Sequence, residues 1–159
     1  MDTRELRNCL GRFATGVTVV TCDTDVGAHG FTVNSFTSVS LDPPLVLVSV
    51  DRKTKAFQFL KNNHFTVNVL KDTQKDTAMH FAGRPQDKRP FEWEKGIHCH
   101  RLQHSLAYIE CEPWAEYDGG DHVLYIGKVV HFKYSDGDAL GYYCGKFLTI
   151  DDGGSMRNP

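Results

Sequence analysis

Two long extended segments in the last third of the sequence constrain the fold most. Residues 107–117 and 122–134 have strand composition, and the Asp-Gly-Gly-Asp sequence between them predicts a hairpin turn. The order along the chain is a helix, many strands, two interposed helices and then this hairpin. Because strands and helices do not alternate regularly, this order predicts a mainly β protein with flanking helices. We expect a β-barrel with helices packed outside it or across its mouth.

Further strands are predicted where β-branched and apolar residues form short runs. Asp42-Pro43-Pro44 interrupts the chain before one of these runs, the apolar sequence LVLVSV, which is typical of a buried strand. The predicted strands are residues 17–22, 30–34, 45–50, 65–70 and 140–143.

Three helices are predicted from capping residues and helical spacing. The first begins at Asp2 or Thr3 and ends at Gly16, with Leu6, Leu10 and Phe13 on one face. The second covers residues 53–62, and the third runs from a cap at Asp72 to about Phe81. Residues 82–96 are polar, contain a lone Trp93, and are predicted to form a loop.

Length and charge limit the classes of partner. The 159 residues fit a single domain over 1–159, with a flexible tail from about residue 150. Lysine and arginine total 18 against 20 acidic residues, so we expect no nucleic-acid partner. The apolar runs are too short to cross a membrane, and the N-terminus lacks an apolar signal core. A cytoplasmic location is therefore expected.

Cysteine and histidine do not predict a metal site. The five cysteines include no CxxC pair, so they are interpreted as free and mostly buried thiols. His98, Cys99 and His100 are adjacent, but alternate residues of a strand point to opposite faces. We therefore expect no bound metal.

An unusual row of small polar residues lies in the segment HGFTVNSFTSVSLDPPLVLVSV, residues 29–50. One interpretation is ordinary: serine and threonine are common on exposed strands, where cross-strand pairs stabilise a sheet. The other is that hydroxyl and backbone N–H groups converge on a flat heterocycle with many acceptors, such as a flavin. The row consists of Thr32, Asn34, Ser35, Thr37, Ser38 and Ser40.

Familiar catalytic and nucleotide-binding motifs are absent from the sequence. It contains no GxGxxG, GxxxxGK[ST], GxSxG or HExxH motif. A dinucleotide would therefore have to bind without a Rossmann unit.

Five sequence blocks, in order, carry a resemblance to a known family. They are FATGVTVVT from residue 13, the segment 29–50, FTVNVL from residue 65, HFAG from residue 80, and GDHVLYIGKV from residue 120. The chain resembles the short-chain flavin reductase family, whose fold is the FMN-binding split β-barrel. It is similar to the reductase components of two-component aromatic monooxygenases, such as the phenol and 4-hydroxyphenylacetate hydroxylases. The resemblance covers roughly residues 5–147 and is specific because five blocks agree in order.

The resemblance implies a set of cofactor-binding residues. Lys53 and Lys55 are both candidates for a cation at the flavin phosphate, and the choice between them stays open. The other residues implied to lie along the flavin ring, the ribityl chain or the outer edge of the ring are Thr32, Val33, Asn34, Ser35, Ser38, Val39, Ser40, Ser49, Val50, Phe81, Ala82 and Gly83. His122 matches a histidine beside the nicotinamide and the flavin, and is the one catalytic candidate. The alternative is that His122 is only a solvated turn residue.

The resemblance also implies an activity. It is hydride transfer from NADH to noncovalently bound FAD or FMN, with release of reduced flavin to a partner monooxygenase, by a homodimer. FAD against FMN and NADH against NADPH stay open. The alternatives are a non-catalytic flavin-binding protein, or a flavoenzyme that keeps its flavin and reduces another acceptor.

Overall fold

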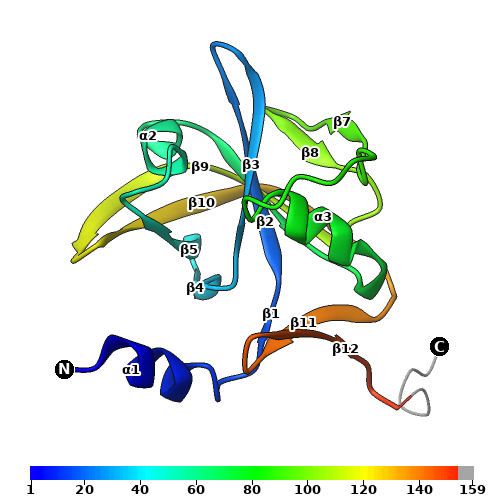
Figure 1. Ribbon diagram of the computed structural model, residues 1–159. Coiled ribbons are helices and arrows are strands. Elements are labelled where there is room, and N and C mark those ends of the chain that lie inside the picture. The colour runs from blue at the N-terminus through cyan, green and yellow to red at the C-terminus, as the bar shows by residue number, and fades with distance from the viewer. Residues whose placement is uncertain (154–159) are drawn as a thin grey trace.

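A seven-stranded antiparallel sheet dominates the computed structural model, which describes residues 1–153 (Figure 1). The strand order is β3-β2-β6-β9-β10-β5-β4. In chain order the strands are β2 (Thr18–Thr24), β3 (Gly27–Val33), β4 (Thr37–Leu41), β5 (Pro44–Asp51), β6 (Phe65–Val69), β9 (Ala107–Gly119) and β10 (His122–Tyr134).

The predicted hairpin is the longest feature of the sheet. β9 and β10 pair from His122 opposite Gly119 to Tyr134 opposite Ala107, with register shifts near Gly127 and Val130. The turn is shorter than the predicted four residues, because Gly120 takes a φ of 75° and lets the chain reverse within two residues. On its other edge β10 pairs with β5, so LVLVSV is an inner strand as expected.

The two edge strands of this sheet are neighbours in the sequence. β3 ends at Val33 and β4 begins at Thr37, so only three residues separate the two edges. Such a link spans at most about 14 Å. The sheet must therefore curl until its edges approach each other at this link, which gives an open barrel.

Two smaller sheets complete the β structure. A three-stranded sheet has the order β1-β11-β12, formed by Thr15–Gly16, Ala139–Tyr143 and Lys146–Ile150. A hairpin of β7 (Trp93–Lys95) and β8 (His100–Leu102) starts within the predicted loop. Neither β7 nor β12 was predicted, because strands of three to five residues carry too short a pattern. Ile150 belongs to β12, and the predicted flexible tail beyond residue 153 lies outside the described residues.

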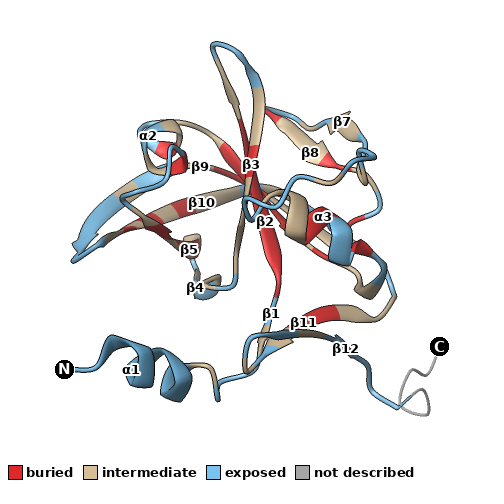
Figure 2. Ribbon diagram, viewed as in Figure 1, coloured by how far each residue is buried: buried red, intermediate tan, exposed pale blue. Residues whose placement is uncertain are grey.

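Helix α1 (Thr3–Leu10) begins as predicted but ends earlier. The Asp2 carboxylate accepts hydrogen bonds from the N–H groups of Arg4 and Glu5 at 3.0 and 3.2 Å. Gly11, not Gly16, is the C-terminal cap, and Gly16 belongs to β1. Figure 2 shows α1 exposed along its whole length, and the Leu10 side chain is 65% exposed.

The other two helices are also shorter than predicted. α2 covers Ala56–Leu60, because Asp51 Oδ1 and the Asp51 carbonyl hold residues 53 and 54 in a turn before it. α3 covers Lys75–His80 and follows a 3₁₀ turn at Asp72–Gln74. The Asp72 position begins this turn, but Lys71 occupies the cap, with its N–H bonded to Gln74 Oε1 at 2.8 Å.

Buried side chains form two clusters. The larger fills the barrel with valines of β2, β5 and β6, together with Phe65, Leu60 and Tyr125. The smaller joins the barrel to α3 and to the three-stranded sheet through Val17, Leu70, Ala78, Leu102 and Leu140. A Cβ atom at Gly127 of β10 would lie 2.6 Å from Phe65 Cζ and 2.7 Å from Cys111 Cβ, so β10 packs tightly at this point.

We expect Gly127→Ala to lower the free energy of unfolding by about 1–3 kcal/mol, because its methyl group overpacks the barrel. Urea unfolding followed by circular dichroism at fixed protein concentration measures this change. Gly16→Ala is the matched control, since no atom lies within 4 Å of its Cβ position. Equal stability of the two variants would show that β10 has room at Gly127.

Candidate functional site

A cavity of about 830 Å³, named here the first cavity, is lined by residues of β3, β5, α2 and the turn after α3. It gathers most of the residues that the sequence predicted at a flavin, although they are distant along the chain. The predicted residues that line it are Thr32, Val33, Asn34, Ser35, Ser49, Val50, Lys55, Phe81, Ala82, Gly83 and His122.

Four predicted residues do not line the first cavity: Ser38, Val39, Ser40 and Lys53. The first three lie on β4, where Ser38 and Ser40 pair with β5 and Val39 falls in a register shift between them. β4 is an edge strand that follows the three-residue link 34–36. The polar row therefore leaves the wall of the first cavity after Ser35. The Lys53 N–H donates to Asp51 Oδ1 at 2.8 Å. Of the two candidate lysines, Lys55 lines the first cavity and Lys53 does not.

Two hydroxyl groups of the polar row build the cavity wall. Ser35 Oγ donates to the Ser49 carbonyl at 2.9 Å and accepts from the Ser49 N–H at 3.0 Å, which ties the link to β5. Thr32 Oγ1 donates to the Ala78 carbonyl at 2.7 Å, and the Thr32 N–H donates to the Phe81 carbonyl at 3.1 Å. Both hydroxyl protons are therefore used within the protein, and the flavin contacts of Ser35 and Thr32 stay predictions. Their contribution is to fix the shape of the wall.

Aromatic rings form one side of the cavity. The ring centroids of Phe81 and Phe91 are 4.7 Å apart, and those of Phe91 and Trp93 are 5.3 Å apart. Gly30 faces Phe81, and a Cβ there would lie 2.9 Å from Phe81 Cε1. From the sequence, Trp93 was predicted only as a residue of a polar loop. Gly30 and Phe91 gave no local signal, because their place in the wall depends on contacts between distant segments.

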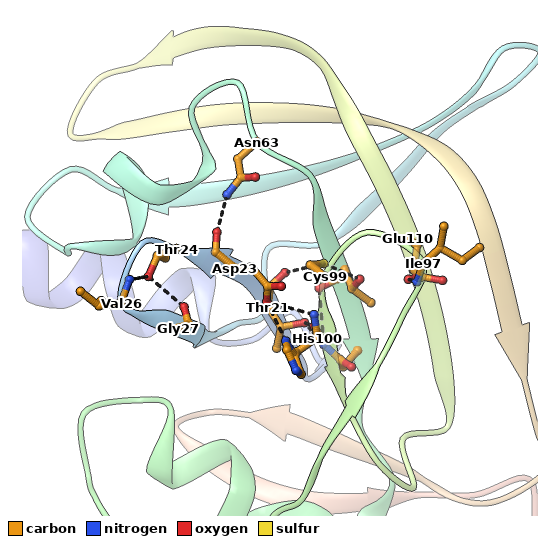
Figure 3. Close-up of polar contacts among 12 residues, drawn as sticks. Thr21, Asp23, Thr24, Val26, Gly27, Asn63, Ile97, Cys99, His100 and Glu110 are labelled. Carbon is orange, nitrogen blue, oxygen red and sulfur yellow. Dashed lines mark hydrogen bonds and ion pairs between the residues drawn. The ribbon is translucent and has the colours of Figure 1, made fainter.

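The short hairpin that carries Trp93 is held by polar contacts to the barrel (Figure 3). Thr21 Oγ1 donates to the His100 carbonyl at 2.8 Å, and Asp23 Oδ1 accepts from the His100 N–H at 3.1 Å. The Ile97 N–H donates to Glu110 Oε1 at 2.6 Å, and the Glu110 side chain is almost fully buried. Because these bonds act at both ends of the 96–100 turn, Trp93 stands on a fixed support.

Another part of the cavity wall is polar and carries both Lys55 and Asp51. Lys55 and Thr54 line it beside His29. Burial lowers the pKa of His29 below its ordinary value of 6.5, and the positive charge of Lys55 lowers it further. His29 is therefore mostly neutral at pH 7, while Lys55 supplies a cation to this part of the cavity.

His122 is positioned by the hairpin turn. Its Nδ1 and Asp121 Oδ1 are 2.7 Å apart, and this hydrogen bond holds the pKa of the Asp121 carboxyl below its usual range. Arg52 also fixes the turn, since its Nε donates to the Gly120 carbonyl at 2.9 Å and its guanidinium pairs with Asp118. Because Nδ1 is engaged with Asp121, Nε2 is the His122 ring nitrogen that remains for a ligand.

The first cavity fits a flavin in volume and in chemistry. Its volume lies within the range of small-molecule and cofactor sites. Small residues, including Gly30, Ala82 and Gly83, let a planar ring approach the backbone, and aromatic residues border them. Lys55 supplies a cation for a phosphate. Among residues 1–153, no three His, Cys, Asp or Glu residues are grouped so that they could hold a metal ion.

Comparison with known proteins identifies the family. The model of the flavin reductase like domain matches residues 10–151. The chain belongs to this family. The resemblance predicted from the sequence is confirmed, as is the expectation of an oxidoreductase of the flavin reductase kind.

Relatives of this family member include reductases from several bacteria. An NADH-dependent flavin reductase of Rhodococcus sp is 39% identical over 152 residues, which are 92% of this chain and 85% of the relative. The reductase component of the flavin-dependent trigonelline monooxygenase of Acinetobacter baylyi is 43% identical over 92% of this chain. The match spans 48% of that relative, so this family member corresponds to about half of its length.

Solved structures of the family share the fold. The flavin reductase PheA2 in its native state has a TM-score of 0.91 and 38% identity, and the match covers 96% of this chain and 100% of that one. A Streptomyces globisporus NADH:FAD oxidoreductase, solved with NAD and FAD fragments, has a TM-score of 0.88 and 34% identity, covering 97% and 96% of the two chains. The predicted fold class, mainly β with flanking helices in a split barrel, is confirmed. No helix within residues 1–153 has both the length and the apolar character to cross a membrane.

We expect the pKa of His29 to lie below 6.5 in an NMR titration of its ring signals. Lys55→Gln should raise this pKa part of the way toward the ordinary value, because it removes the charge and leaves the larger effect of burial. Lys61→Gln, a change at an exposed lysine that does not line the first cavity, is the control and should leave the His29 titration unchanged. A His29 pKa at or above 6.5 in the unchanged protein would contradict the proposed environment.

Proposed function

We propose that this chain uses NADH to reduce FMN or FAD, bound noncovalently in the first cavity, and releases the reduced flavin to a separate monooxygenase. The single observation that carries the proposal is that residues 32–35, 49–50 and 81–83 and His122 line one cavity. The relatives from Rhodococcus and Acinetobacter, a flavin reductase and a monooxygenase reductase component, support it.

The bound flavin would supply the acceptor for a hydride from NADH, and the protein supplies binding and orientation. Lys55 and Thr54 hold the flavin phosphate, and the aromatic wall of Phe81, Phe91 and Trp93 excludes water from the ring. Nε2 of His122 accepts a hydrogen bond from the nicotinamide carboxamide, in an orientation that Asp121 fixes through Nδ1. Ser38, Val39, Ser40 and Lys53 stay predictions as flavin contacts, and they lie outside the first cavity.

The activity is tested by following NADH consumption with no added flavin, with FMN and with FAD. A reductase that releases its product requires added flavin, and its rate saturates with flavin concentration. A non-catalytic flavin-binding protein consumes no NADH. A flavoenzyme that keeps its flavin has a rate independent of added flavin. The same assay with NADPH decides the nicotinamide preference.

His122→Ala should raise the KM for NADH about fivefold, since one neutral hydrogen bond contributes about 1 kcal/mol. The dissociation constant for flavin, measured by fluorescence, should change much less, because the cavity wall is intact. His98→Ala is the control, since His98 is exposed and does not line the first cavity. Unchanged NADH kinetics would refute the nicotinamide role, and a weakened flavin affinity alone would make His122 a flavin ligand.

A homodimer of one domain per chain, located in the cytoplasm, completes the proposal. α1 has no buried residue in the single chain, and Leu10 and Phe13 are 65% and 79% exposed. Phe132 and Tyr134 of β10 are 63% and 75% exposed. Apolar surface of this extent is typical of a surface that another chain covers.

Light scattering at micromolar concentration should give twice the chain mass of 17.9 kDa. Changing both Leu10 and Phe13 to Asp should shift the mass toward the monomer, because charges in an apolar interface are desolvated. Val26→Asp is the matched control, since Val26 is 92% exposed at the β2–β3 turn. A monomeric unchanged protein that still consumes NADH would exclude the dimer.

A further inference from the structure

The hairpin of β7 and β8 brings Trp93 into the wall of the first cavity, although each of its strands has only three residues. A two-stranded hairpin is at best marginally stable in water by itself. Trp93 pairs with the buried Leu102 across the hairpin, and Glu94 pairs with Arg101. Because adjacent residues of a strand point to opposite faces, Glu94 and Arg101 lie on the face turned away from Trp93. The contacts of this second face therefore help to set where Trp93 stands.

One side chain joins that second face to the barrel. The Arg101 side chain is 14% exposed, and its Nη2 lies 3.5 Å from Glu94 Oε2 in the hairpin. Its Nη1 lies 3.6 Å from Glu110 Oε2 on β9, and its guanidinium carbon lies 4.4 Å from the centroid of the Tyr108 ring, also on β9. Arg101 thus bridges the hairpin that carries Trp93 and the middle strand of the seven-stranded sheet.

Both carboxylates are held in place for this bridge. The Tyr108 hydroxyl donates to Glu94 Oε1 at 3.1 Å. Glu110 Oε1 accepts from the Ile97 N–H, while its Oε2 has no hydrogen-bond partner among residues 1–153 and lies near Arg101. The Glu110 side chain is 2% exposed, and a carboxylate so deeply buried is costly without a cation beside it.

The shape of Arg101 matters here as well as its charge. A planar guanidinium can face two carboxylates at once, whereas a lysine ammonium is a point charge on a flexible stem. Arg101 Nε is buried without a hydrogen-bond partner among residues 1–153, so Glu94, Glu110 and the Tyr108 ring are the groups that hold the guanidinium. His131 Nε2 of β10 also lies 3.9 Å from Glu110 Oε2, with its side chain 42% exposed. Arg101→Lys would therefore keep a charge near Glu110 and lose the bridge to Glu94.

We propose that Arg101 is a positioning residue for the reaction in the first cavity: it bridges Glu94 and Glu110 and so holds Trp93 where the redox ring packs. Arg101 itself does not line the first cavity, so it acts through the hairpin. The inference rests on the proposed function, which places the bound flavin against the aromatic wall that includes Trp93. Hydride transfer depends steeply on the placement of the ring, so a small shift of Trp93 lowers the rate.

Arg101→Lys tests the bridge while it keeps the charge. We expect kcat/KM for the flavin to fall about tenfold, because a displacement of about 1 Å can cost up to about a hundredfold. A second variant, Arg101→Met with Glu110→Gln, removes both charges, leaves no buried ion without a partner, and should lose activity to a similar extent. Lys128→Met with Glu112→Gln is the matched control and should keep kcat/KM, since it removes a β9–β10 ion pair of 3.9 Å whose residues do not line the first cavity.

A double-mutant cycle separates positioning from general support of the fold. Trp93→Leu should by itself lower kcat/KM, and Arg101→Lys should then add no further loss, because the side chain that Arg101 positions is gone. If Arg101 only stabilises the fold, the two losses add, and additive losses would overturn the inference. A lower stability in urea with unchanged kinetic constants would overturn it as well.

The position of Trp93 can also be followed without flavin or NADH. The chain has two tryptophans, so Trp114→Phe leaves Trp93 as the only emitting one. In this background Arg101→Lys should shift the Trp93 emission to longer wavelength and increase its quenching by acrylamide, because the ring gains contact with water. Unchanged emission and quenching would show that Arg101 does not hold Trp93, and would overturn the inference.

These measurements separate the inference from the proposed function. If the unchanged protein consumes no NADH with either flavin, the proposed function fails, and the emission of Trp93 still tests whether Arg101 holds the wall. If the unchanged protein is a reductase and the losses in the cycle are additive, the inference about Arg101 fails and the reductase activity stands.

Discussion

The structure depends on one constraint of chain connectivity: three residues join the two outermost strands of the seven-stranded sheet. An open sheet of seven strands that did not curl would separate these edges by several strand spacings, far more than such a link can span. The sheet therefore curls, and the link itself becomes the place where the barrel stays open. Ser35 locks this arrangement by bonding both backbone groups of Ser49 on β5. The first cavity lies at this opening. Asn34 and Ser35 of the link that joins the two edge strands therefore also line the site.

The elements outside the barrel give the site its chemical polarity. α3 and the β7–β8 hairpin bring Phe81 and Trp93 to one side, and the hairpin is fixed by Asp23 and the buried Glu110. α2 and the turn before it bring Lys55 to the other side. The aromatic residues suited to a ring and the lysine suited to a phosphate thus come from elements that are not adjacent in the sequence. The barrel supplies a rigid frame between them.

Much of the fold followed from local pattern. The β9–β10 hairpin, the buried β5 and the cap at Asp2 carry strong period-two or capping signals, and each is present as predicted. The predictions failed where the signal was short or ambiguous. Gly16 was a plausible helix end, but Gly11 caps α1 five residues earlier, and β7 and β12 are too short to show a period. The small polar residues identified the segment of the site, but their individual roles could not be read from their type.

The sequence by itself determined a mainly β chain and its family, and it predicted a set of flavin contacts, because periodicity and ordered motifs are local properties of the chain. Only the tertiary structure decided which of those residues face the cavity. It brings Lys55 rather than Lys53 to the wall, turns Ser38 and Ser40 onto the outer β4 edge, and uses the Thr32 and Ser35 hydroxyls to hold the wall together. It also adds Gly30, Phe91 and Trp93 to the wall of the first cavity. The physical reason is that hydrogen-bond partners and burial are set by segments far apart in the sequence, whose approach no local pattern encodes.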